Sequence, residues 1–409
     1  MIGHGPILFV TASAPLTNAD EAFVQDELTA MLRQGRGLVV VPMRRRLAGP
    51  NEAARKAGLA DCTEQRSLVD PSIVIGAIGT VFRSPLITVR VLGTILARSG
   101  GIRNLLANLA SLPKALWLVR FARRTGAVHV HAYWLAHTST AAWVVSRFTG
   151  IPWSGTGYRW DIDAENLFDA KIPSAAFIRC ADELGRELLQ AQVTRRDATT
   201  AIRMIRTGVA MPESPVWGEH PVEPLVVGCI GAFVEKKAQS LLVRAFRPFH
   251  DEWPAAKLHL FGGGPLESDV RAEVAVQRLG DSVEFHGTVP LSEIRAFLAS
   301  RPVTVLPSIL TPDQQQEGIP VTLVEAMAHG SPVVSTRSGA IPNLVTEGCG
   351  VLLDPGDVDS ITRALAAIAS DPAAADLRSR RAFARVHAEF AIDTTARELL
   401  DFIEQTVAA

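Results

Sequence analysis

The sequence is poor in tyrosine and cysteine. Its 409 residues contain two tyrosines and four cysteines, Cys62, Cys180, Cys229 and Cys349. The cysteines show no paired spacing typical of a metal site, and no secretory leader precedes them. We therefore expect reduced, buried thiols rather than a disulfide framework, which predicts a cytoplasmic protein.

Long apolar runs and several catalytic signatures are also missing. A membrane-spanning helix requires roughly 20 apolar residues, and Arg83 and Arg90 interrupt the most apolar region, 73–97. We therefore expect no membrane-spanning segment. The sequence has no nucleophile elbow, zinc cluster or Walker-type loop, and no Gly-x-Gly-x-x-Gly follows the first predicted strand. These absences argue against a dehydrogenase or a kinase.

The composition is that of a folded globular protein of two or more domains, with 47% hydrophobic and 20% charged residues. Short buried strands alternate with apolar helical stretches such as 21–32, on both sides of the proline-rich stretch 211–224. This alternation predicts an α/β fold of two doubly wound, Rossmann-like parallel sheets. The predicted strands are 7–10, 38–41 and 127–130, followed by 225–230, 257–261, 303–306 and 332–335.

Charge is distributed unevenly along the chain, although the net charge is only −1. Residues 1–210 contain 25 Lys or Arg and 16 Asp or Glu, a balance of +9, whereas residues 211–409 contain 16 and 26, a balance of −10. Local positive potential concentrates anions, so the first half is expected to meet an anionic acceptor, such as a lipid-linked phosphate, or a membrane surface. Scattered, solvated arginines are the alternative.

Two groups of arginines illustrate these alternatives. Three follow the strand-like run 37–42, and three stand at helical spacing in the apolar segment 113–124. For that segment we predict a core helix with a charged rim, in preference to peripheral membrane contact. The two groups are Arg44, Arg45 and Arg46, and Arg120, Arg123 and Arg124.

The segment 317–334 contains the most informative pattern of the chain. Pro320 can occupy the first turn of a helix, and Gly330 can end it, so Glu317 is expected on the preceding loop and Glu325 about two turns into the helix. Such a helix start carries about half a positive charge and unpaired N–H donors. It suits the diphosphate of a nucleotide sugar without a metal ion. Two solvated glutamates on an ordinary turn are the alternative.

Six segments of the second half, in chain order, resemble the retaining glycosyltransferases of family 4, which have the GT-B fold. The resemblance implies two Rossmann-like domains that face each other across a cleft, an acceptor-binding domain at 1–212 and a nucleotide-sugar-binding domain at 213–390. It also implies that a C-terminal helix within 391–409 packs back toward the first domain. The six segments are 227–237, 258–265, 283–289, 305–308, 317–334 and 350–356.

At the matching positions, the resemblance implies catalytic roles for Glu317, Lys237, Asp161 and Tyr158. Lys237 is in register with the family's phosphate-binding lysine, whose ammonium group would stabilise the departing diphosphate. The sugar donor is expected to contact the second glutamate, a glycine loop and the helix start. These residues are Glu325, Gly263, Gly264, Gly318, Ile319, Pro320, Val321, Thr322 and Leu323.

The sequence departs from the family pattern at four positions. Ala232 stands where an arginine usually also grips the diphosphate, and Asn343 stands for a glutamate. Tyr158 and Tyr133 replace histidines, so both tyrosines of the chain fall at expected cleft positions. A tyrosine hydroxyl can donate a hydrogen bond to a sugar, but a pKa of about 10 makes it a poor base at neutral pH.

Three side chains at the end of the first sheet are candidates for contact with the acceptor: His131, Tyr133 and Arg159. His129 and His131 alternate along a predicted strand and share one face, which permits metal binding in principle. Because no third ligand is nearby, we predict hydrogen-bonded histidines and no metal site.

These observations predict a retaining, metal-independent hexosyltransferase without a cofactor. It would move a sugar from a nucleotide-diphosphate sugar to a glycan, lipid-linked or small-molecule acceptor, and would bind no nucleic acid. We expect it in the cytoplasm, with the inner face of the membrane as the alternative location. Two other functions stay open: a non-catalytic GT-B-like subunit of a glycan-assembly complex, which Ala232 and Tyr158 would allow, and a nucleotide-sugar epimerase of GT-B architecture.

Overall fold

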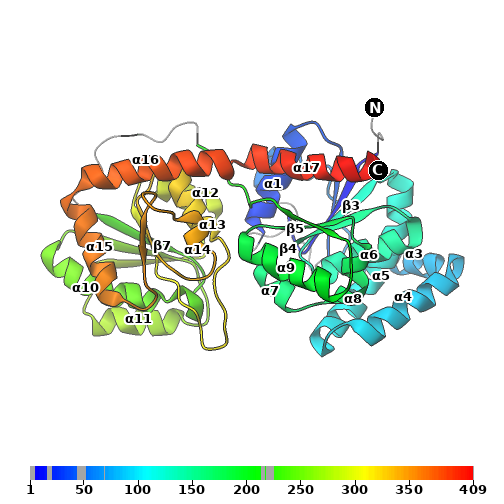
Figure 1. The fold of residues 1–409 in the computed structure, drawn as a ribbon, viewed down its shortest axis with the longest axis horizontal. Coiled ribbons are helices and arrows are strands. Elements are labelled where there is room, and N and C mark those ends of the chain that lie inside the picture. The colour runs from blue at the N-terminus through cyan, green and yellow to red at the C-terminus, as the bar shows by residue number, and fades with distance from the viewer. Residues whose placement is uncertain are drawn as a thin grey trace. The chain divides into compact units, whose positions relative to one another are not determined.

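The computed structural model describes residues 5–15, 21–43, 52–68, 70–212, 217 and 225–408. The chain divides into two compact α/β units (Figure 1), the first made of Met1–Gly208 and Ile392–Ala409 and the second of Val209–Ala391. The arginines at 44–46 and most of the proline-rich stretch 211–224 lie outside the described residues.

The first unit is built on a parallel six-stranded sheet. Its strand order is β2, β1, β3, β4, β5, β6, so the chain switches direction across the sheet between β1 and β3. The predicted strands 7–10 and 38–41 correspond to β1 and β2, whereas β3 begins and ends a few residues later than predicted. The strands are β1 (Ile7–Thr11), β2 (Leu38–Pro42), β3 (His129–Tyr133), β4 (Trp153–Gly157), β5 (Phe177–Cys180) and β6 (Ala201–Met204).

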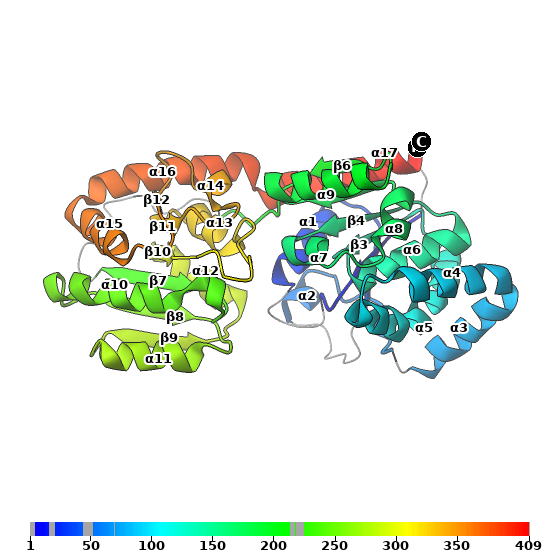
Figure 2. The ribbon, with the colours of Figure 1, turned by 60° about the horizontal axis from the view of Figure 1, so that its bottom comes forward.

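Helices cover both faces of this sheet (Figure 2). Strand side chains alternate between the faces, so Leu8 and Val10 join one buried apolar cluster while Ile7 and Phe9 join another. The helices are α1 (Ala22–Arg33), α2 (Glu52–Lys56), α3 (Pro71–Arg83), α4 (Pro85–Arg98), α5 (Ile102–Thr125), α6 (His137–Thr149), α7 (Arg159–Asp163), α8 (Phe168–Lys171) and α9 (Glu183–Arg195), with the 3-10 turn η1 (Ile172–Ser174).

Helix α5 is the central helix of this unit and packs against α3 and α6. Its second half buries Ala115, Leu118 and Ala122 while Arg120 and Arg124 stay exposed, which confirms the predicted core helix with a charged rim. By length and apolar composition, α5 could cross a membrane, but 56% of its most apolar 18-residue window is buried inside the protein. Together α3 and α4 are also long and apolar enough, but they are bent by 110° at their junction.

The C-terminal helix α17 (Ile392–Ala408) belongs to the first unit, although the whole second unit precedes it in the chain. Its apolar face, which includes Ala396 and Leu399, is buried in the same cluster as Leu28 of α1. An exposed ion pair between Arg33 and Asp393, at 3.0 Å, lies at the edge of this contact. Helix α17 is therefore held mainly by apolar burial, because an exposed ion pair contributes about 1 kcal/mol or less.

The second unit repeats the architecture with another parallel six-stranded sheet. Its order is β12, β11, β10, β7, β8, β9, so the chain switches direction between β7 and β10. The predicted two-sheet α/β architecture is therefore confirmed. The strands are β7 (Val226–Ile230), β8 (Lys257–Phe261), β9 (Val283–Gly287), β10 (Val303–Leu306), β11 (Val333–Thr336) and β12 (Val351–Leu353).

One continuous apolar core joins the sheet of the second unit to its helices. The helix that we predicted within the segment 317–334 corresponds to α13. Pro320 is its N-cap, and Gly330 lies just beyond its end with a left-handed backbone conformation. The helices are α10 (Gln239–Glu252), α11 (Glu267–Val276), α12 (Leu291–Ala299), α13 (Val321–Ala328), α14 (Ile341–Leu344), α15 (Val358–Ser370) and α16 (Pro372–Glu389), with the 3-10 turn η2 (Glu235–Lys237).

Candidate functional site

The strand order of the second unit places two loops side by side at its switch point. Strand β7 leads into η2 and on to β8 on one side of the sheet, whereas β10 leads to β11 on the other side. The loops are tied together, because the backbone N–H of Ile309 donates to the carbonyl of Lys236 at 2.9 Å. In open α/β sheets, the crevice between two such diverging loops is the usual position of a ligand.

Glu317 and Lys237 meet at this switch point. The Lys237 ammonium lies 2.9 Å from Oε1 of Glu317, and the Lys236 ammonium lies 3.9 Å from Oε2. Ser308, just after β10, donates to the same carboxylate at 3.3 Å. The side chains of Glu317 and Lys237 are only 6% and 13% exposed, so this is a largely desolvated charge cluster. The predicted proximity of Glu317 and Lys237 is therefore present in the structure.

The backbone of Glu317 is fixed by the loop after β11. Its carbonyl accepts from the N–H of Ala340 at 3.0 Å, and Gly339 packs directly against it. Gly339 has φ +55°, and a Cβ at this position would lie 1.9 Å from the Glu317 carbonyl oxygen. Only glycine fits there without displacing the Glu317 backbone. The hydroxyl of Ser338 is buried in the same loop without a hydrogen-bond partner among the described residues.

The residues expected to bind the sugar donor at the helix start divide into two groups. Gly318, Ile319, Val321 and Thr322 are partly exposed, and their backbone precedes or begins α13. Pro320 and Leu323 are buried, and the Leu323 N–H already donates to the Pro320 carbonyl at 3.0 Å. The first group is therefore the accessible part of the helix start, and the Leu323 side chain belongs to the core.

Glu325 is the fifth residue of α13, closer to the helix start than predicted, and it is bound by a cation that the sequence analysis missed. Nη2 of Arg295, on α12, lies 2.7 Å from Oε1 of Glu325, and Nε lies 3.3 Å from Oε2. The Glu325 carboxylate is 3% exposed and that arginine 27% exposed. Contact between Glu325 and the sugar donor stays a prediction, and in such a contact the carboxylate would be shared with Arg295.

The glycine loop after β8 is shaped by contact with the loop after β7. Gly262 and Gly264 have φ values of +125° and +157°, and Cβ atoms there would lie 2.1 Å from the carbonyl oxygen of Gly231 and 2.6 Å from that of Phe233. Gly263 is only partly buried, and the nearest atom to a Cβ at this position is a side-chain hydroxyl. Close packing of two protein loops thus explains Gly264, while Gly263 stays a candidate for contact with the sugar donor.

In the first unit, the structure corrects the predicted position of Tyr133. Tyr133 is fully buried within β3, and its hydroxyl donates a short hydrogen bond to Glu27 of α1. The same carboxylate pairs with the buried guanidinium of Arg179 at 2.7 Å. Burial and the neighbouring carboxylate raise the pKa of Tyr133 well above its usual value. This residue is therefore part of an internal polar cluster and does not face an acceptor.

His131 is also buried inside the sheet, which corrects its predicted place among the acceptor contacts. Its two ring nitrogens lie 2.7 Å from the hydroxyl of Ser154 and 2.9 Å from that of Thr156. His129 contacts the same serine at 2.7 Å. Burial lowers the pKa of both histidines. They are neutral residues between β3 and β4, and they are hydrogen-bonded as predicted.

Asp161 is fully buried, so its predicted catalytic position is also corrected. One carboxylate oxygen accepts from the backbone N–H of Tyr158 at 2.6 Å, and the other accepts a short hydrogen bond from the N–H of Leu135. Burial raises the pKa of this carboxyl group to about 7, although these N–H donors and Lys171 act against the shift. Asp161 thus holds the loop after β3 against the start of α7. Arg159 is partly exposed and lies 3.4 Å from Asp163 on the same helix.

Tyr158 lies at the carboxyl end of the first sheet, but only its ring is accessible. Its hydroxyl oxygen is buried, next to Thr207, and burial raises its pKa, so donation to a sugar is not supported. The ring contacts Trp134 at a centroid distance of 4.7 Å, and Trp134 in turn contacts Trp160, which is 57% exposed. The sequence analysis missed this aromatic group, although Trp134 and Trp160 each follow a strand of the first sheet.

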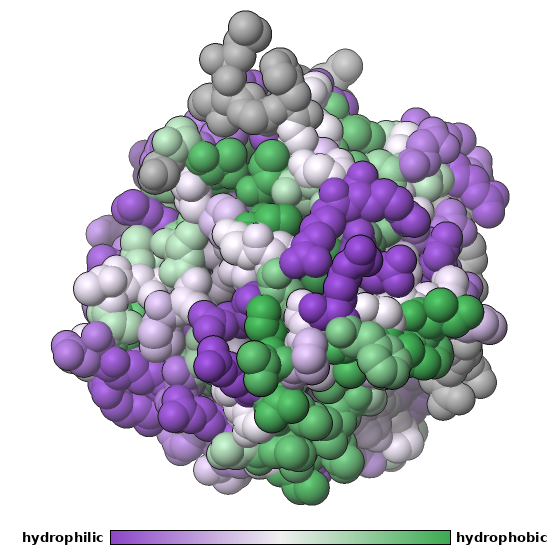
Figure 3. All heavy atoms as spheres, turned by 90° about the vertical axis from the view of Figure 1, so that its right-hand side faces the viewer, coloured by the Kyte–Doolittle hydropathy of each residue, from purple (hydrophilic) through white to green (hydrophobic). Residues whose placement is uncertain are grey.

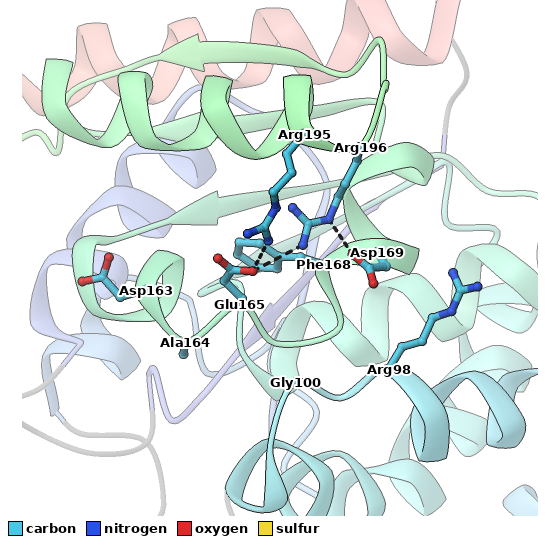
Figure 4. Close-up of a pocket in the computed structure, with 9 residues that line it drawn as sticks. All are labelled: Arg98, Gly100, Asp163, Ala164, Glu165, Phe168, Asp169, Arg195 and Arg196. Atoms are coloured by element: carbon cyan, nitrogen blue, oxygen red, sulfur yellow. Dashed lines mark hydrogen bonds and ion pairs between the residues drawn. The ribbon is translucent and has the colours of Figure 1, made fainter.

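A polar pocket of about 530 Å³ lies between α4, α8 and the end of α9 in the first unit (Figure 4). Two of its arginines are neutralised: Arg195 pairs with Glu165, and Arg196 pairs with Asp169 at 2.8 Å. Arg98, at the end of α4, lines the pocket without an ion pair among the described residues. The pocket was not predicted, because its charged residues come from segments that are distant in the sequence and share no recognisable motif; Arg195, for example, lies 30 positions from Glu165.

Within the described residues, one group has three side chains close enough to share a metal ion. The ligand atoms of His259 on β8 and of Glu284 and His286 on β9 lie within 4.8 Å of one another. The two imidazoles are hydrogen-bonded at 2.9 Å. This cluster is mostly exposed on the outer strands of the second sheet, whereas Glu317 and Lys237 lie at the switch point between β7 and β10.

Comparison with known proteins finds a family match in the second unit. Residues 224–371 match the family model described as Glycosyl transferases group 1, and this range contains Glu317, Lys237 and the sheet of the second unit. One relative is WcaL of Escherichia coli (strain K12), whose name describes it as a colanic acid biosynthesis glycosyltransferase. The two chains are 36% identical over 168 residues, and the match covers 41% of each.

A second relative is the GDP-mannose-dependent alpha-(1-6)-phosphatidylinositol monomannoside mannosyltransferase of Mycolicibacterium smegmatis. Its identity is 32% over 157 residues, which cover 38% of this chain and 40% of the relative. The chain thus matches less than half the length of these relatives.

Two solved structures share the fold over nearly the whole chain. Sucrose-phosphate synthase from Thermosynechococcus elongatus has a TM-score of 0.71 at 18% identity, covering 99% of this chain and 100% of that one. HepE of Anabaena in complex with UDP has a TM-score of 0.67 at 15% identity, covering 98% and 100%. At these identities the likeness shows the fold, which is the two-unit GT-B architecture that the sequence predicted.

Proposed function

We propose that this protein is a glycosyltransferase that transfers a sugar from a nucleotide-diphosphate sugar to an acceptor held by its first unit. The observation that carries the proposal is the Glu317–Lys237 contact of 2.9 Å beside the start of α13. It joins a desolvated cation, a carboxylate and a helix start at the switch point of a sheet, within a range that matches a glycosyltransferase family model.

The names of the relatives support the chemical class of the substrate. HepE was solved with UDP and with UDP-glucose, and the mycobacterial relative is named as GDP-mannose-dependent. We therefore expect the sugar donor to be a uridine or guanosine diphosphate sugar. The same names include colanic acid biosynthesis and a phosphatidylinositol monomannoside, so a glycan or a glycolipid precursor is the proposed acceptor.

In the proposed reaction, the bond between the anomeric carbon and the diphosphate oxygen breaks, and a bond to the acceptor oxygen forms. The acceptor proton passes to the departing phosphate, so a strong protein base is not needed. Lys237 and the N–H groups at the start of α13 stabilise the charge that develops on the diphosphate. Glu317, held by Lys237 and by the Gly339 loop, accepts hydrogen bonds from the transferred sugar and keeps it oriented.

Retention at the anomeric carbon and independence of metal ions are parts of the same proposal. The positive charge that a metal would supply to the diphosphate is available from Lys237, Lys236 and the helix start. The protein would act in the cytoplasm, where nucleotide sugars are available. We expect full activity in excess EDTA. We also expect the product, analysed by NMR, to keep the anomeric configuration of the sugar donor.

Nucleotide binding is tested with a thermal-shift panel of UDP, GDP, ADP and their glucose and mannose conjugates. A ligand at about 100 times its Kd should stabilise the native protein by about 2.7 kcal/mol. Glu317→Gln should remove most of the shift given by the best nucleotide sugar, while Glu235→Ala, an exposed carboxylate on the neighbouring turn, should not change it. The nucleotide-binding proposal fails if no compound of the panel shifts the melting temperature.

Turnover is then tested by mass spectrometry of the nucleotide sugar with and without a lipid and glycan extract. Transfer that depends on the extract and is lost in Glu317→Gln supports a glycosyltransferase. Nucleotide binding without transfer indicates the non-catalytic alternative. Conversion of the nucleotide sugar to an isomer without any acceptor indicates the epimerase.

A further inference from the structure

Exposed apolar side chains are concentrated in one segment of the first unit. Among the described residues, 14 large apolar side chains are exposed, and ten of them lie between Val74 and Leu106. This segment contains α3, α4 and the first turns of α5. Figure 3 shows a broad apolar area on the side of the molecule that carries these helices, next to hydrophilic side chains. Patches of this kind on soluble proteins mark interaction surfaces.

Helix α3 has an apolar outer face as well as an apolar inner face. Ile73 and Ala77 point into the core, while Ile78 and Phe82 are exposed, Phe82 by 81%. The residues Val74, Ile78 and Phe82 are spaced by four, so they form one stripe along the helix. An ordinary surface helix would carry polar residues at these positions.

Helix α4 repeats this pattern with a smaller buried side. Only Val91 and Ile95 are buried, whereas Leu86, Val89 and Leu96 are exposed, at 76%, 69% and 55%. The spacing of three and seven residues again places the exposed side chains on one face of the helix. The core therefore accounts for Val91, Ile95 and the partly buried Ile87, and it leaves the exposed apolar side chains of α4 without a partner in this unit.

Arginines without acidic partners border the apolar area. Arg83, Arg90, Arg98 and Arg103 are exposed, and none of them forms an ion pair or a hydrogen bond through its side chain with any described residue. The sequence explains this, because residues 71–160 contain ten Lys or Arg and no Asp or Glu. A surface that is both apolar and purely cationic is complementary to an anionic lipid surface.

The helix geometry favours a position in the membrane interface. The 110° bend between α3 and α4 keeps this pair from forming one straight span. Helix α5 is anchored in the core, where the ammonium of Lys114 donates to the carbonyls of Pro42 and Arg66 at 2.6 and 2.5 Å. An amphipathic helix pair attached to a folded unit is instead typical of a protein that lies on one leaflet.

We propose that the exposed apolar side chains of α3, α4 and the first turns of α5 dock on an anionic membrane surface. The apolar side chains enter the boundary between headgroups and acyl chains, and the arginines bind lipid phosphates. This docking face would bring the first unit to an acceptor carried by the membrane. It is independent of the nucleotide site in the second unit, so its test can fail without affecting the proposed function.

The apolar contribution is tested by sedimentation with vesicles of phosphatidylcholine containing about 30% phosphatidylglycerol. We expect the triple variant Ile78→Ser/Phe82→Ser/Leu86→Ser to bind roughly 100-fold more weakly than the wild type. These side chains are exposed, so circular dichroism and the melting temperature should not change. The matched control is Val276→Ser/Leu377→Ser, two exposed apolar residues of the second unit, which should bind as the wild type does.

The charge contribution is tested with Arg83→Gln/Arg90→Gln on the same vesicles. Each arginine near an anionic surface contributes about fivefold in affinity, so the double variant should bind about 25-fold more weakly. On pure phosphatidylcholine the two proteins should bind equally. Arg337→Gln/Arg363→Gln, exposed arginines of the second unit, should have no effect.

Three results would overturn the proposal. The first is a wild-type protein that does not sediment with anionic vesicles. The second is a triple serine variant that binds within twofold of the wild type. The third is a wild-type dimer in light scattering that the triple variant converts to a monomer, because a second copy of the chain would then cover the apolar face.

Discussion

Replacement of Lys237 by alanine should weaken binding of a nucleoside diphosphate by about 10- to 150-fold. This range follows from the roughly 1.5–3 kcal/mol that a hydrogen bond to a charged group contributes. The structure places Lys237 where such a bond is strong, because its side chain is 13% exposed and its ammonium group lies 2.9 Å from Glu317. Bulk water and salt screen a charge in this position less than they screen one at the surface.

Lys236 provides the matched control. It is the neighbouring lysine on the same turn, but its side chain is 30% exposed and its ammonium group lies 3.9 Å from the Glu317 carboxylate. We expect Lys236→Ala to weaken binding by less than about fivefold, the range of an exposed ion pair. Isothermal titration with UDP and GDP at one fixed ionic strength measures both variants, and a melting curve shows that each is folded.

Part of the effect of Lys237→Ala comes from Glu317, which is left nearly buried with a weaker cation partner. Its carboxylate then repels an incoming diphosphate. The double variant Lys237→Ala/Glu317→Gln should therefore bind nucleoside diphosphate more tightly than Lys237→Ala alone. Equal losses in Lys236→Ala and Lys237→Ala, or unchanged nucleotide affinity in a folded Lys237→Ala protein, would refute the assignment of the phosphate-binding cation.

Three further predictions concern the framework. Gly339→Ala should destabilise the second unit by about 2 kcal/mol or more and should reduce nucleotide binding. The control is Gly356→Ala, where φ is +86° and the space around the glycine is open, so this variant should cost only the backbone strain of about 1–2 kcal/mol. Thermal unfolding of the two variants measures the difference. Asp161 has a native pKa of about 7 against 3.8 in the unfolded chain, so its stability contribution is complete below pH 4 and is lost as the pH rises through 7. Asp161→Asn should remove this dependence, a difference of up to about 4 kcal/mol in unfolding free energy between pH 4 and 7.5. Arg179→Leu leaves a buried carboxylate without its cation and should cost about 3–5 kcal/mol in the unfolding free energy of the first unit, as measured by denaturant titration; wild-type stability would contradict this.

The parts of the fold that sequence could predict are those with local signals. Apolar runs such as 7–10 and 38–41 coincide with most of β1 and β2, because a strand covered on both faces needs continuous apolar residues. The proximity of Glu317 and Lys237 was also predictable. Both follow strands of a parallel sheet, and all carboxyl ends of such a sheet lie at one edge.

Two of the incorrect site predictions share one cause. Tyr133 and His131 lie inside β3, two residues apart, whereas the sequence placed the strand end before them. A shift of a few residues in a strand boundary moves a side chain from the open edge into the core. Asp161 was misplaced for another reason: its hydrogen bond to Leu135 joins residues 26 positions apart, and no local pattern reports such a contact. Arg295, 30 positions from Glu325, was missed for the same reason.

The distribution of charge separates the two binding tasks that we propose. Residues 71–160 carry ten positive and no negative side chains, while the first unit as a whole has 26 Lys or Arg and 20 Asp or Glu, so the rest of that unit is net negative by four. The excess of positive charge in this unit thus lies in one segment, which includes the exposed apolar helices. Chance solvation of arginines does not explain this coincidence, whereas an anionic lipid surface requires both features in one place.

The second unit carries a net charge of the opposite sign to that of the segment 71–160. It has 15 Lys or Arg and 22 Asp or Glu, a balance of −7, although we propose that it binds an anionic nucleotide. Its overall field cannot attract that ligand, so affinity must come from short-range contacts in a desolvated place. The pairing of Lys237 with Glu317 beside the start of α13 is such a place. Nucleotide affinity should therefore depend only weakly on salt, and vesicle binding by the first unit should depend on it strongly.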